Sequence, residues 1–222
     1  MWLTSSSIGR KFVMALTGAF LILFVTFHVL MNGVALFWPT AYNVICEFLG
    51  ANWYALIGTA ILAGGFVLHI LFALWLTYEN RRARGGDSYA VTSRPKQVEW
   101  SSKNMLVLGI VVLGIVVFHL NHFWAEMQLK EFQGHHAENP YELLNATFQN
   151  GWMVVAYVIW FAALGLHLMH GFWSAFQTIG MSNKVWESRL LLIGKVIVGI
   201  IVLGFSAVAV NAFIQANGCC CC

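Results

Sequence analysis

Five long apolar stretches, separated by shorter polar segments, dominate the pattern of hydrophobic and polar positions along the chain. Each stretch holds 26 or more residues, whereas a membrane-spanning helix needs about 20. Their apolar residues run continuously and do not alternate with period two, so the pattern favours helices over a membrane β-barrel. The predicted fold class is all-α integral membrane, a single domain built as a five-transmembrane-helix bundle. Its spans lie at about residues 12–37, 53–78, 104–130, 151–179 and 190–216.

The composition excludes a soluble or disordered chain. Of the 222 residues, 59% are hydrophobic and only 9% are charged, whereas a soluble domain is about 25% charged. Arg10 and Lys11 precede the first stretch, as in a signal peptide, but the stretch is too long and no small-residue cleavage site follows. We therefore expect it to be the first membrane helix. Five spans leave no room for a large aqueous domain, so chemistry on a polar substrate must belong to another chain, and no nucleic-acid partner is expected.

The distribution of Lys and Arg predicts the orientation. With the N-terminus inside and the C-terminus outside, eleven of the twelve cations lie on the inner side or just within it, and only Lys130 lies outside. Cytoplasmic loops carry such an excess of Lys and Arg. The polar segment from Glu79 to Lys103, which contains several of these cations, is then an inner loop. We expect a multi-pass protein of the inner (cytoplasmic) cell membrane, surrounded by lipid.

Six of the eight histidines fall within the spans, at His28, His69, His119, His122, His167 and His170. Ionisable groups inside a membrane are costly and usually functional. Four of them recur at the same distance along their helices, because each of the first four spans carries a histidine about 16 residues from its start. At 1.5 Å per residue this is about 24 Å of travel. Alternate helices run in opposite directions, so His28 and His119 should lie together toward the outer face, and His69 and His167 toward the inner face.

Two histidine pairs at two depths are what two stacked b haems with bis-histidine ligation need, because each iron takes one axial imidazole from each of two facing helices. Glycines within the spans would let a flat macrocycle approach a helix, although glycine also simply aids helix packing in membranes. These glycines are Gly18, Gly58, Gly64, Gly65, Gly109, Gly114 and Gly165. Arg10, Lys11 and Trp100 on the inner side and Trp124 on the outer side are candidate donors to haem propionates.

A rival interpretation is a His-cluster di-iron membrane oxygenase or desaturase. His122 and His170 each follow a predicted ligand by three residues, and H-x-x-H spacing can bind a single metal. Such enzymes gather their histidine motifs at one membrane face, whereas here they fall at both. His135 and His136, in the outer loop, lack an H-x-x-H-H context and are expected to be solvated.

The chain resembles the di-haem cytochrome b membrane anchor of succinate:quinone oxidoreductases (succinate dehydrogenase or fumarate reductase), in the class with one five-helix anchor subunit. The resemblance covers nearly the whole chain. It rests on the segments SIGRKFVMALTG, FHVLMNG, VLHILFALWLTYENRRAR, VFHLNHFW and GLHLMHGFWSAFQTIG.

The resemblance implies axial ligands at four positions. His69 and His167 would bind the proximal haem b near the inner subunits, and His28 and His119 the distal one, with His167 preferred to His170 because G-F-W-S follows it at the family spacing. His122 and His170 would support or pack against the ligands. Some relatives carry a proton-conducting Glu just before the fourth ligand, where this chain has Gly165 and Leu166, so that path is not expected here.

The resemblance also implies a quinone site at the outer end. Glu47, between the first two spans, matches the place of an acidic residue linked to quinol oxidation, although an ordinary solvated carboxylate is an equal alternative. Glu126 lies seven residues after His119, so on an α-helix it shares that face. It too is a candidate for proton exchange with the quinone.

The function implied is electron transfer between an iron–sulfur subunit and a membrane quinone through two haems b, and the quinone expected in this class is menaquinone. FAD and the iron–sulfur clusters would belong to partner subunits on the inner face, where dicarboxylate chemistry would occur. A di-haem anchor of a hydrogenase or formate dehydrogenase remains an alternative. Cys46 is isolated and the terminal run Cys219 to Cys222 has no second pair for a metal site, so the cysteines support no redox inference.

Overall fold

The computed structural model of the chain describes residues 5–50, 52–84, 100–181, 183 and 185–218. This part is built from helices and contains no strand. Five helices are long and apolar enough to cross a membrane, namely Ser7–Leu36, Trp53–Ala83, Met105–Phe132, Gly151–Thr178 and Trp186–Gly218. The predicted all-α bundle of five membrane helices is thereby confirmed. Three regions discussed above lie outside the described residues. They are residues 85–99 of the predicted inner loop, Lys184, which was counted as an inner charge, and the run Cys219 to Cys222, to which no role was assigned.

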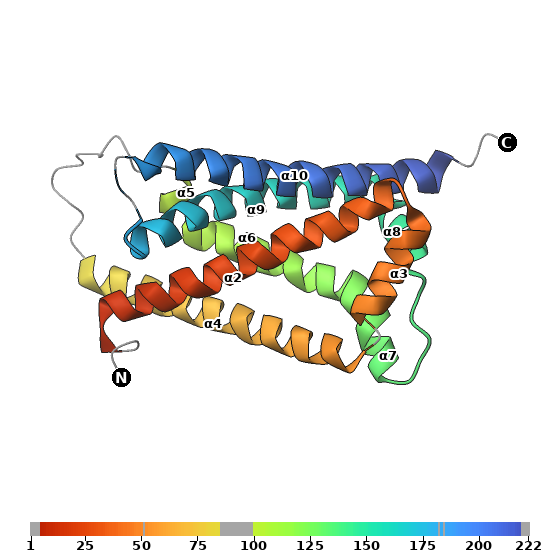
Figure 1. The fold of residues 1–222 in the computed structure, drawn as a ribbon, viewed down its shortest axis with the longest axis horizontal. Helices are drawn as coiled ribbons and strands as arrows, with labels where there is room; N and C mark the ends of the chain where they lie inside the picture. The colour runs from red at the N-terminus through yellow and green to blue at the C-terminus, as the bar shows by residue number, and fades with distance from the viewer. Residues whose placement is uncertain (1–4, 51, 85–99, 182, 184, 219–222) are drawn as a thin grey trace.

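The five long helices lie alongside one another, and the short helices gather at the ends (Figure 1). The long elements are α2 (Ser7–Gly33), α4 (Trp53–Arg84), α6 (Met105–His119), α9 (Gly151–Thr178) and α10 (Trp186–Gly218). The short helices α3 (Pro39–Gly50), α7 (Lys130–Phe132) and α8 (Pro140–Phe148) lie together at one end, here called the α8 end. The other end, here called the α5 end, carries α5 (Trp100–Lys103) and the N-terminus.

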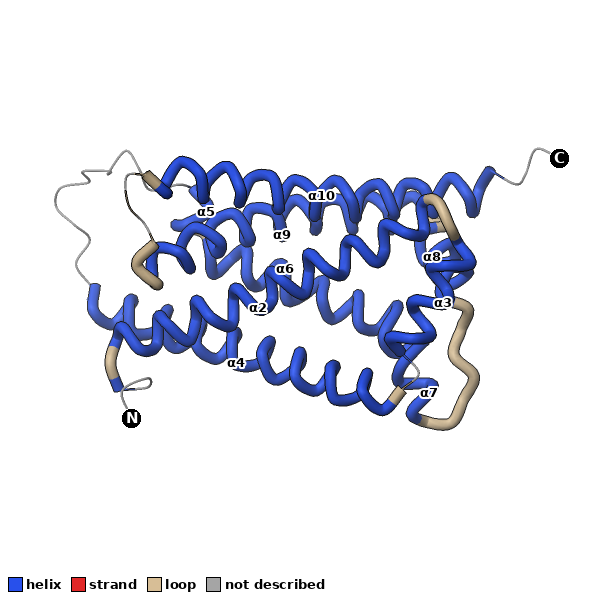
Figure 2. Tube along the Cα trace, viewed as in Figure 1, coloured by secondary structure: helices blue, strands red, loops and turns tan. Residues whose placement is uncertain are grey.

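Side-chain caps explain where several helices begin. Ser6 caps α2, with its hydroxyl accepting a hydrogen bond from the Gly9 backbone N–H at 3.0 Å, so the helix starts before the apolar stretch does. Asn150 caps α9 in the same way. Asn139 caps α8 and Pro140 occupies its first turn, which are preferred residues for these positions. The tube in Figure 2 shows how little of the described chain is left for loops.

The backbone widens after α6. Residues Leu120–Leu129 form η2, a π-helical continuation of α6 that leads into α7. In a π-helix each N–H bonds five residues back instead of four, which gives roughly 4.4 residues per turn. Side chains after His119 therefore point in directions that α-helical periodicity does not predict.

Helix packing centres on α9 and α10. These two helices contact each other most extensively, and both also pack against α2. Ile201 of α10 is completely buried in the cluster that joins them, together with Val29 of α2 and Leu168 of α9. α4 lies at the margin, and among the described helices its most extensive backbone contact is with α2. Large apolar side chains such as Leu23 and Leu203 are more than two-thirds exposed, as expected for helices that face lipid.

A second cluster closes the bundle at the α8 end. Phe148 of α8 packs against Tyr157 of α9 with ring centroids 5.1 Å apart. Trp160 and Phe161 continue the aromatic contacts along α9, and Phe161 stacks on Phe205 of α10. α8 therefore seals the bundle with aromatic packing instead of lying free in the loop.

Gly165 marks the closest approach of α9 and α10, and its replacement tests that packing. A Cβ at position 165 would lie 2.7 Å from Val202 Cγ2, whereas a Cβ at Gly199 would meet nothing within 4 Å. Overpacking of this kind costs about 1–3 kcal/mol. We predict that Gly165→Ala lowers the thermal midpoint of the purified protein in detergent, whereas the matched Gly199→Ala does not. Equal midpoints for the two variants would contradict the packing described here.

Candidate functional site

The histidines of the first four spans form two pairs, each joining two helices. In the first pair, the rings of His28 on α2 and His119 at the end of α6 have centroids 5.9 Å apart and planes at 85°. In the second pair, the rings of His69 on α4 and His167 on α9 lie 6.4 Å apart at 69°. The partners in each pair are the ones predicted from depth, so the structure brings these four residues together as expected.

The two pairs lie at different levels of the bundle. Thr17 of α2 contacts His69, and His28 follows it on the same helix after eleven residues, or about 16 Å. On α6, the distance between the two levels is counted from Gly109, which faces His167. His119 follows Gly109 by ten residues, or about 15 Å. Two separate helices therefore give the same spacing of about 15 Å between the pairs.

The surroundings of the two pairs differ. The His28–His119 pair is enclosed by aromatic rings, with Phe24 stacked on His28 at 5.4 Å and Trp160 6.0 Å from His119. The His69–His167 pair is lined by glycines instead. A Cβ on Gly18 would lie 3.4 Å from Cε1 of His69, and a Cβ on Gly109 would lie 3.7 Å from Cε1 of His167.

The geometry of both pairs fits axial ligation of a haem iron. Metal–nitrogen bonds to histidine are about 2 Å long, so an iron held between two imidazoles keeps the ring centroids about 6 Å apart. Both observed separations are close to this value. Among the described residues, no group of three or more His, Cys, Asp or Glu is placed to hold a metal ion. Paired imidazoles suit a metal that brings its remaining ligands in a macrocycle, whereas the di-iron alternative needs clusters.

His167 also fails the ordinary structural explanation for a membrane histidine. Its Nδ1 is buried and has no hydrogen-bond partner among the described residues. A buried polar atom without a partner costs about 1–3 kcal/mol, so this nitrogen adds no stabilising bond to the packing of α9. Among the described helices, α4 makes its most extensive backbone contact with α2.

The remaining histidines occupy different surroundings. Nδ1 of His122 lies 3.2 Å from the hydroxyl of Tyr157 on α9, which is a hydrogen bond between neighbouring helices. His170 lies one helical turn beyond His167 on α9. His135 and His136 are exposed in the segment between α7 and α8. His122 is therefore engaged with α9, and His170 stays next to His167 on its own helix.

Glu126 does not share the face of His119. Seven residues make almost two turns of an α-helix, but about 1.6 turns of the π-helix that the chain adopts here. The Glu126 carboxylate instead lies 2.6 Å from the ammonium of Lys130, which also contacts Glu138 at 3.1 Å. The structure thus places Glu126 in an ion-pair network at the α8 end, and the helical periodicity that linked it to His119 does not hold.

Glu47 is exposed on α3, next to half-buried Cys46, whose partner Tyr42 is buried. The hydroxyl of Tyr42 donates to Oδ1 of Asn32 at 3.3 Å, four residues after His28, and the side chains of Tyr42 and Cys46 are hydrogen-bonded. Burial raises the pKa of Tyr42. Burial also raises the pKa of Cys46, to about 11, against the lowering effect of the bond from Tyr42, and the Glu47 charge raises it further. Both groups therefore remain neutral at physiological pH.

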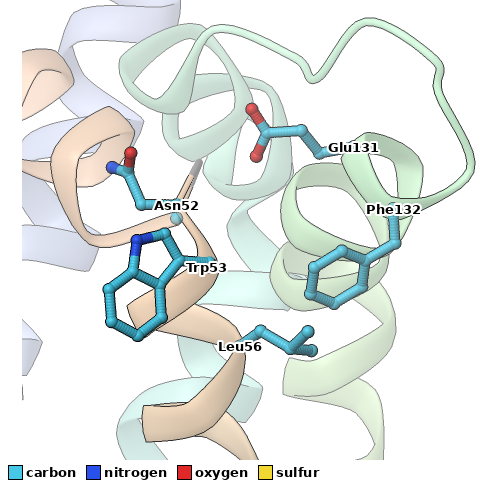
Figure 3. A pocket seen from close by; sticks show the side chains of 6 residues that line it. Asn52, Trp53, Leu56, Glu131 and Phe132 are labelled. Atoms are coloured by element: carbon cyan, nitrogen blue, oxygen red, sulfur yellow. The ribbon is translucent and has the colours of Figure 1, made fainter.

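A small pocket at the α8 end brings in a carboxylate that the sequence indicated only as an outer charge. The pocket has a volume of about 170 Å³ and is lined by Gly50, Asn52, Trp53, Leu56, Glu131 and Phe132. Figure 3 shows the Glu131 carboxylate and the Asn52 amide on one side of it, with Leu56 and the rings of Trp53 and Phe132 on the other. It thus combines a proton-exchanging group with flat apolar walls, and no periodicity in the sequence joins the start of α4 to α7.

Two of the candidate propionate donors, Arg10 and Trp124, are already engaged within the protein. The Arg10 guanidinium is 2.9 Å from Oε2 of Glu79 and lies over the ring of Trp75 at 5.3 Å. Nε1 of Trp75 donates to the other Glu79 oxygen at 3.0 Å, so these three residues fasten α2 to α4 at the α5 end. At the opposite end Trp124 donates to Gln128, whose side-chain oxygen also accepts from Thr59 of α4.

The chain matches no protein-family model, and a comparison with curated proteins returns no match. The candidate site is therefore argued from its own geometry.

The raised pKa of Cys46 gives a test of the α3 packing. We predict that alkylation of Cys46 in a chain with Cys219 to Cys222 replaced by Ser is slow at pH 8, because only the thiolate reacts. The rate should rise toward pH 11, the value at which burial sets the pKa, and not level off near the value of about 8.5 for a free thiol. The pH profile of maleimide labelling measures this. A half-maximal rate near pH 8.5 would show that α3 does not bury this side chain.

Proposed function

We propose that the chain is the di-haem cytochrome b membrane anchor of a succinate:quinone oxidoreductase and transfers electrons between a partner iron–sulfur subunit and a membrane quinone. The observation that carries the proposal is the geometry of the two inter-helix histidine pairs, with ring separations of 5.9 and 6.4 Å at two levels of the bundle. The five-helix architecture and the sequence motifs around each histidine support the same assignment.

In this proposal the chain's own residues hold two haems b in an insulated path across the membrane. His69 and His167 hold the proximal haem and His28 and His119 the distal one, and each bound haem supplies a one-electron centre. The spacing of about 15 Å between the pairs, from the helix rise, brings the edges of two macrocycles close together. The lipid-facing apolar residues of the five helices exclude water from the path.

The two ends of the bundle suit different partners. At the inner end the sequence places most cations, which favour docking of an iron–sulfur subunit and, beyond it, a FAD-containing flavoprotein that acts on the dicarboxylate. At the α8 end the Glu131 pocket and exposed Glu47 offer carboxylates for proton exchange with a quinone, which we take to be menaquinone. The protein would then reside in the inner cell membrane.

The ligand assignment is tested by removing one histidine at a time. We predict that His69→Leu or His167→Leu halves the haem-to-protein ratio of the purified complex and leaves the spectrum of the other haem intact. The matched variant His122→Leu, which loses only its bond to Tyr157, should keep both haems. Reduced-minus-oxidised spectra, recorded after succinate and after dithionite, make the measurement. A wild-type protein without a haem α-band contradicts the function, and two haems in either ligand variant contradict the assignment.

The role of Glu47 is tested by removing its charge. We predict that Glu47→Gln slows quinol-linked turnover at least about tenfold, because a positioned acid or base typically contributes more than this, while both haem spectra stay unchanged. The control is Glu142→Gln, which removes another exposed carboxylate at the same end. If Glu131→Gln slows turnover and Glu47→Gln does not, proton exchange belongs to the pocket carboxylate instead.

A further inference from the structure

Thr17 is one of the few buried polar side chains in the described part of the molecule, with 9% of its surface exposed. It lies on α2, and its Oγ1 is 3.2 Å from Nδ1 of His69 on α4. The same oxygen lies 2.9 Å from the Val13 carbonyl oxygen and 3.1 Å from that of Met14. Thr17 therefore joins its own helix backbone to the imidazole of the neighbouring helix.

The proton count of this contact favours one state of His69. A threonine hydroxyl has one proton to donate and lone pairs to accept with. The two backbone carbonyls can only accept, so the hydroxyl proton is shared between them when Thr17 bonds back to its own helix. In that arrangement the remaining lone pair faces Nδ1 of His69, which carries the proton of the bond. This tautomer leaves Nε2 unprotonated, and an unprotonated nitrogen is what a metal ligand requires.

The imidazole of His69 is in close contact with α2 as well as hydrogen-bonded to it. Gly18 follows Thr17 directly, and a Cβ there would lie 3.4 Å from Cε1 of His69. That distance is tight enough to move the ring. Hydrogen bond and close contact therefore act on the same imidazole from consecutive residues of α2. The opposite member of the pair differs, because Nδ1 of His167 has no partner among the described residues.

We infer that Thr17 is the positioning residue for His69, accepting a hydrogen bond from its Nδ1–H and so directing Nε2 toward the iron of the proximal haem. This inference rests on the proposed function. A bond from Nδ1–H to an acceptor raises the basicity of a metal-bound imidazole, and loss of such a partner typically weakens metal binding 10- to 100-fold. A more basic ligand favours the ferric state, so Thr17 holds the reduction potential of this haem down.

The experiment compares Thr17→Val with Thr17→Ser in the purified complex. We expect Val, which has the same shape without the hydroxyl, to raise the midpoint potential of one haem, shift its low-spin ferric EPR signal, and speed its loss to apomyoglobin about tenfold or more. Ser keeps the hydroxyl and should restore wild-type values. The control is Thr77→Val on α4, since Thr77 makes the same kind of bond to the carbonyl of Ala73 at 2.7 Å.

Each outcome of this experiment either supports or overturns the role of Thr17. Unchanged potentials and EPR signals in Thr17→Val overturn the inference, as do equal shifts of both haems or a Ser variant that behaves like Val. If Thr17→Val does not assemble, Thr17→Ala, which avoids the extra methyl groups, is measured in its place against Ser. A shift in Thr77→Val of the same size would assign the effect to helix packing. Absence of haem from the wild-type complex would instead contradict the proposed function, so the two failures are distinguishable.

Discussion

The fold depends on the need to bring four imidazoles from four helices together as two pairs inside an apolar bundle. A polar group in a low-dielectric interior is costly, and here each ring faces a ring from another helix. Pairing across helices requires four helices around the two sites, held at different heights. α10, which contributes no histidine to the pairs, packs against α2 and α9 and buries Ile201 at their junction. It supplies the apolar contact that the helices around the imidazoles cannot make with one another.

The ends of the bundle are closed in different ways, and each suits its position. At the α5 end Arg10, Glu79 and Trp75 fasten α2 to α4 through an ion pair and a cation–π contact. At the α8 end the aromatic packing of Phe148 and Tyr157 closes the bundle, beside the ion pairs of Lys130 with Glu126 and Glu138. α4 is held at both ends, by Arg10 and by the Thr59–Gln128 bond, and from between these points its His69 faces His167. The closures thus hold α4 in place beside the histidine pair.

The sequence was sufficient to predict the five helices and the partners of the four paired histidines, because both follow from regular geometry. A constant rise per residue converts position into depth, so His28 and His119 could be matched before any contact was known. That regularity fails at Leu120, where the π-helix turns Glu126 away from His119. α8 was missed although Asn139 and Pro140 form a recognisable start. The contact of Thr17 with His69 joins residues far apart in sequence, and no local pattern encodes it.

The two histidine pairs differ in the properties by which a protein tunes a bound iron. Hydrogen bonds to the ligands and the polarity of the surroundings are two separate controls on its potential. The His69–His167 pair carries a hydroxyl bond on one ring and glycine surfaces on two helices. The His28–His119 pair lies among Phe24, Trp160 and Phe205. The four imidazoles are therefore held in unlike environments, one pair with the Thr17 bond and glycine surfaces, the other with aromatic enclosure and a 3.5 Å contact from Asn32 to Nδ1 of His28. A chain that only needed to bind two identical groups would gain nothing from this difference, whereas one that passes electrons between unequal partners needs two centres that can be tuned independently.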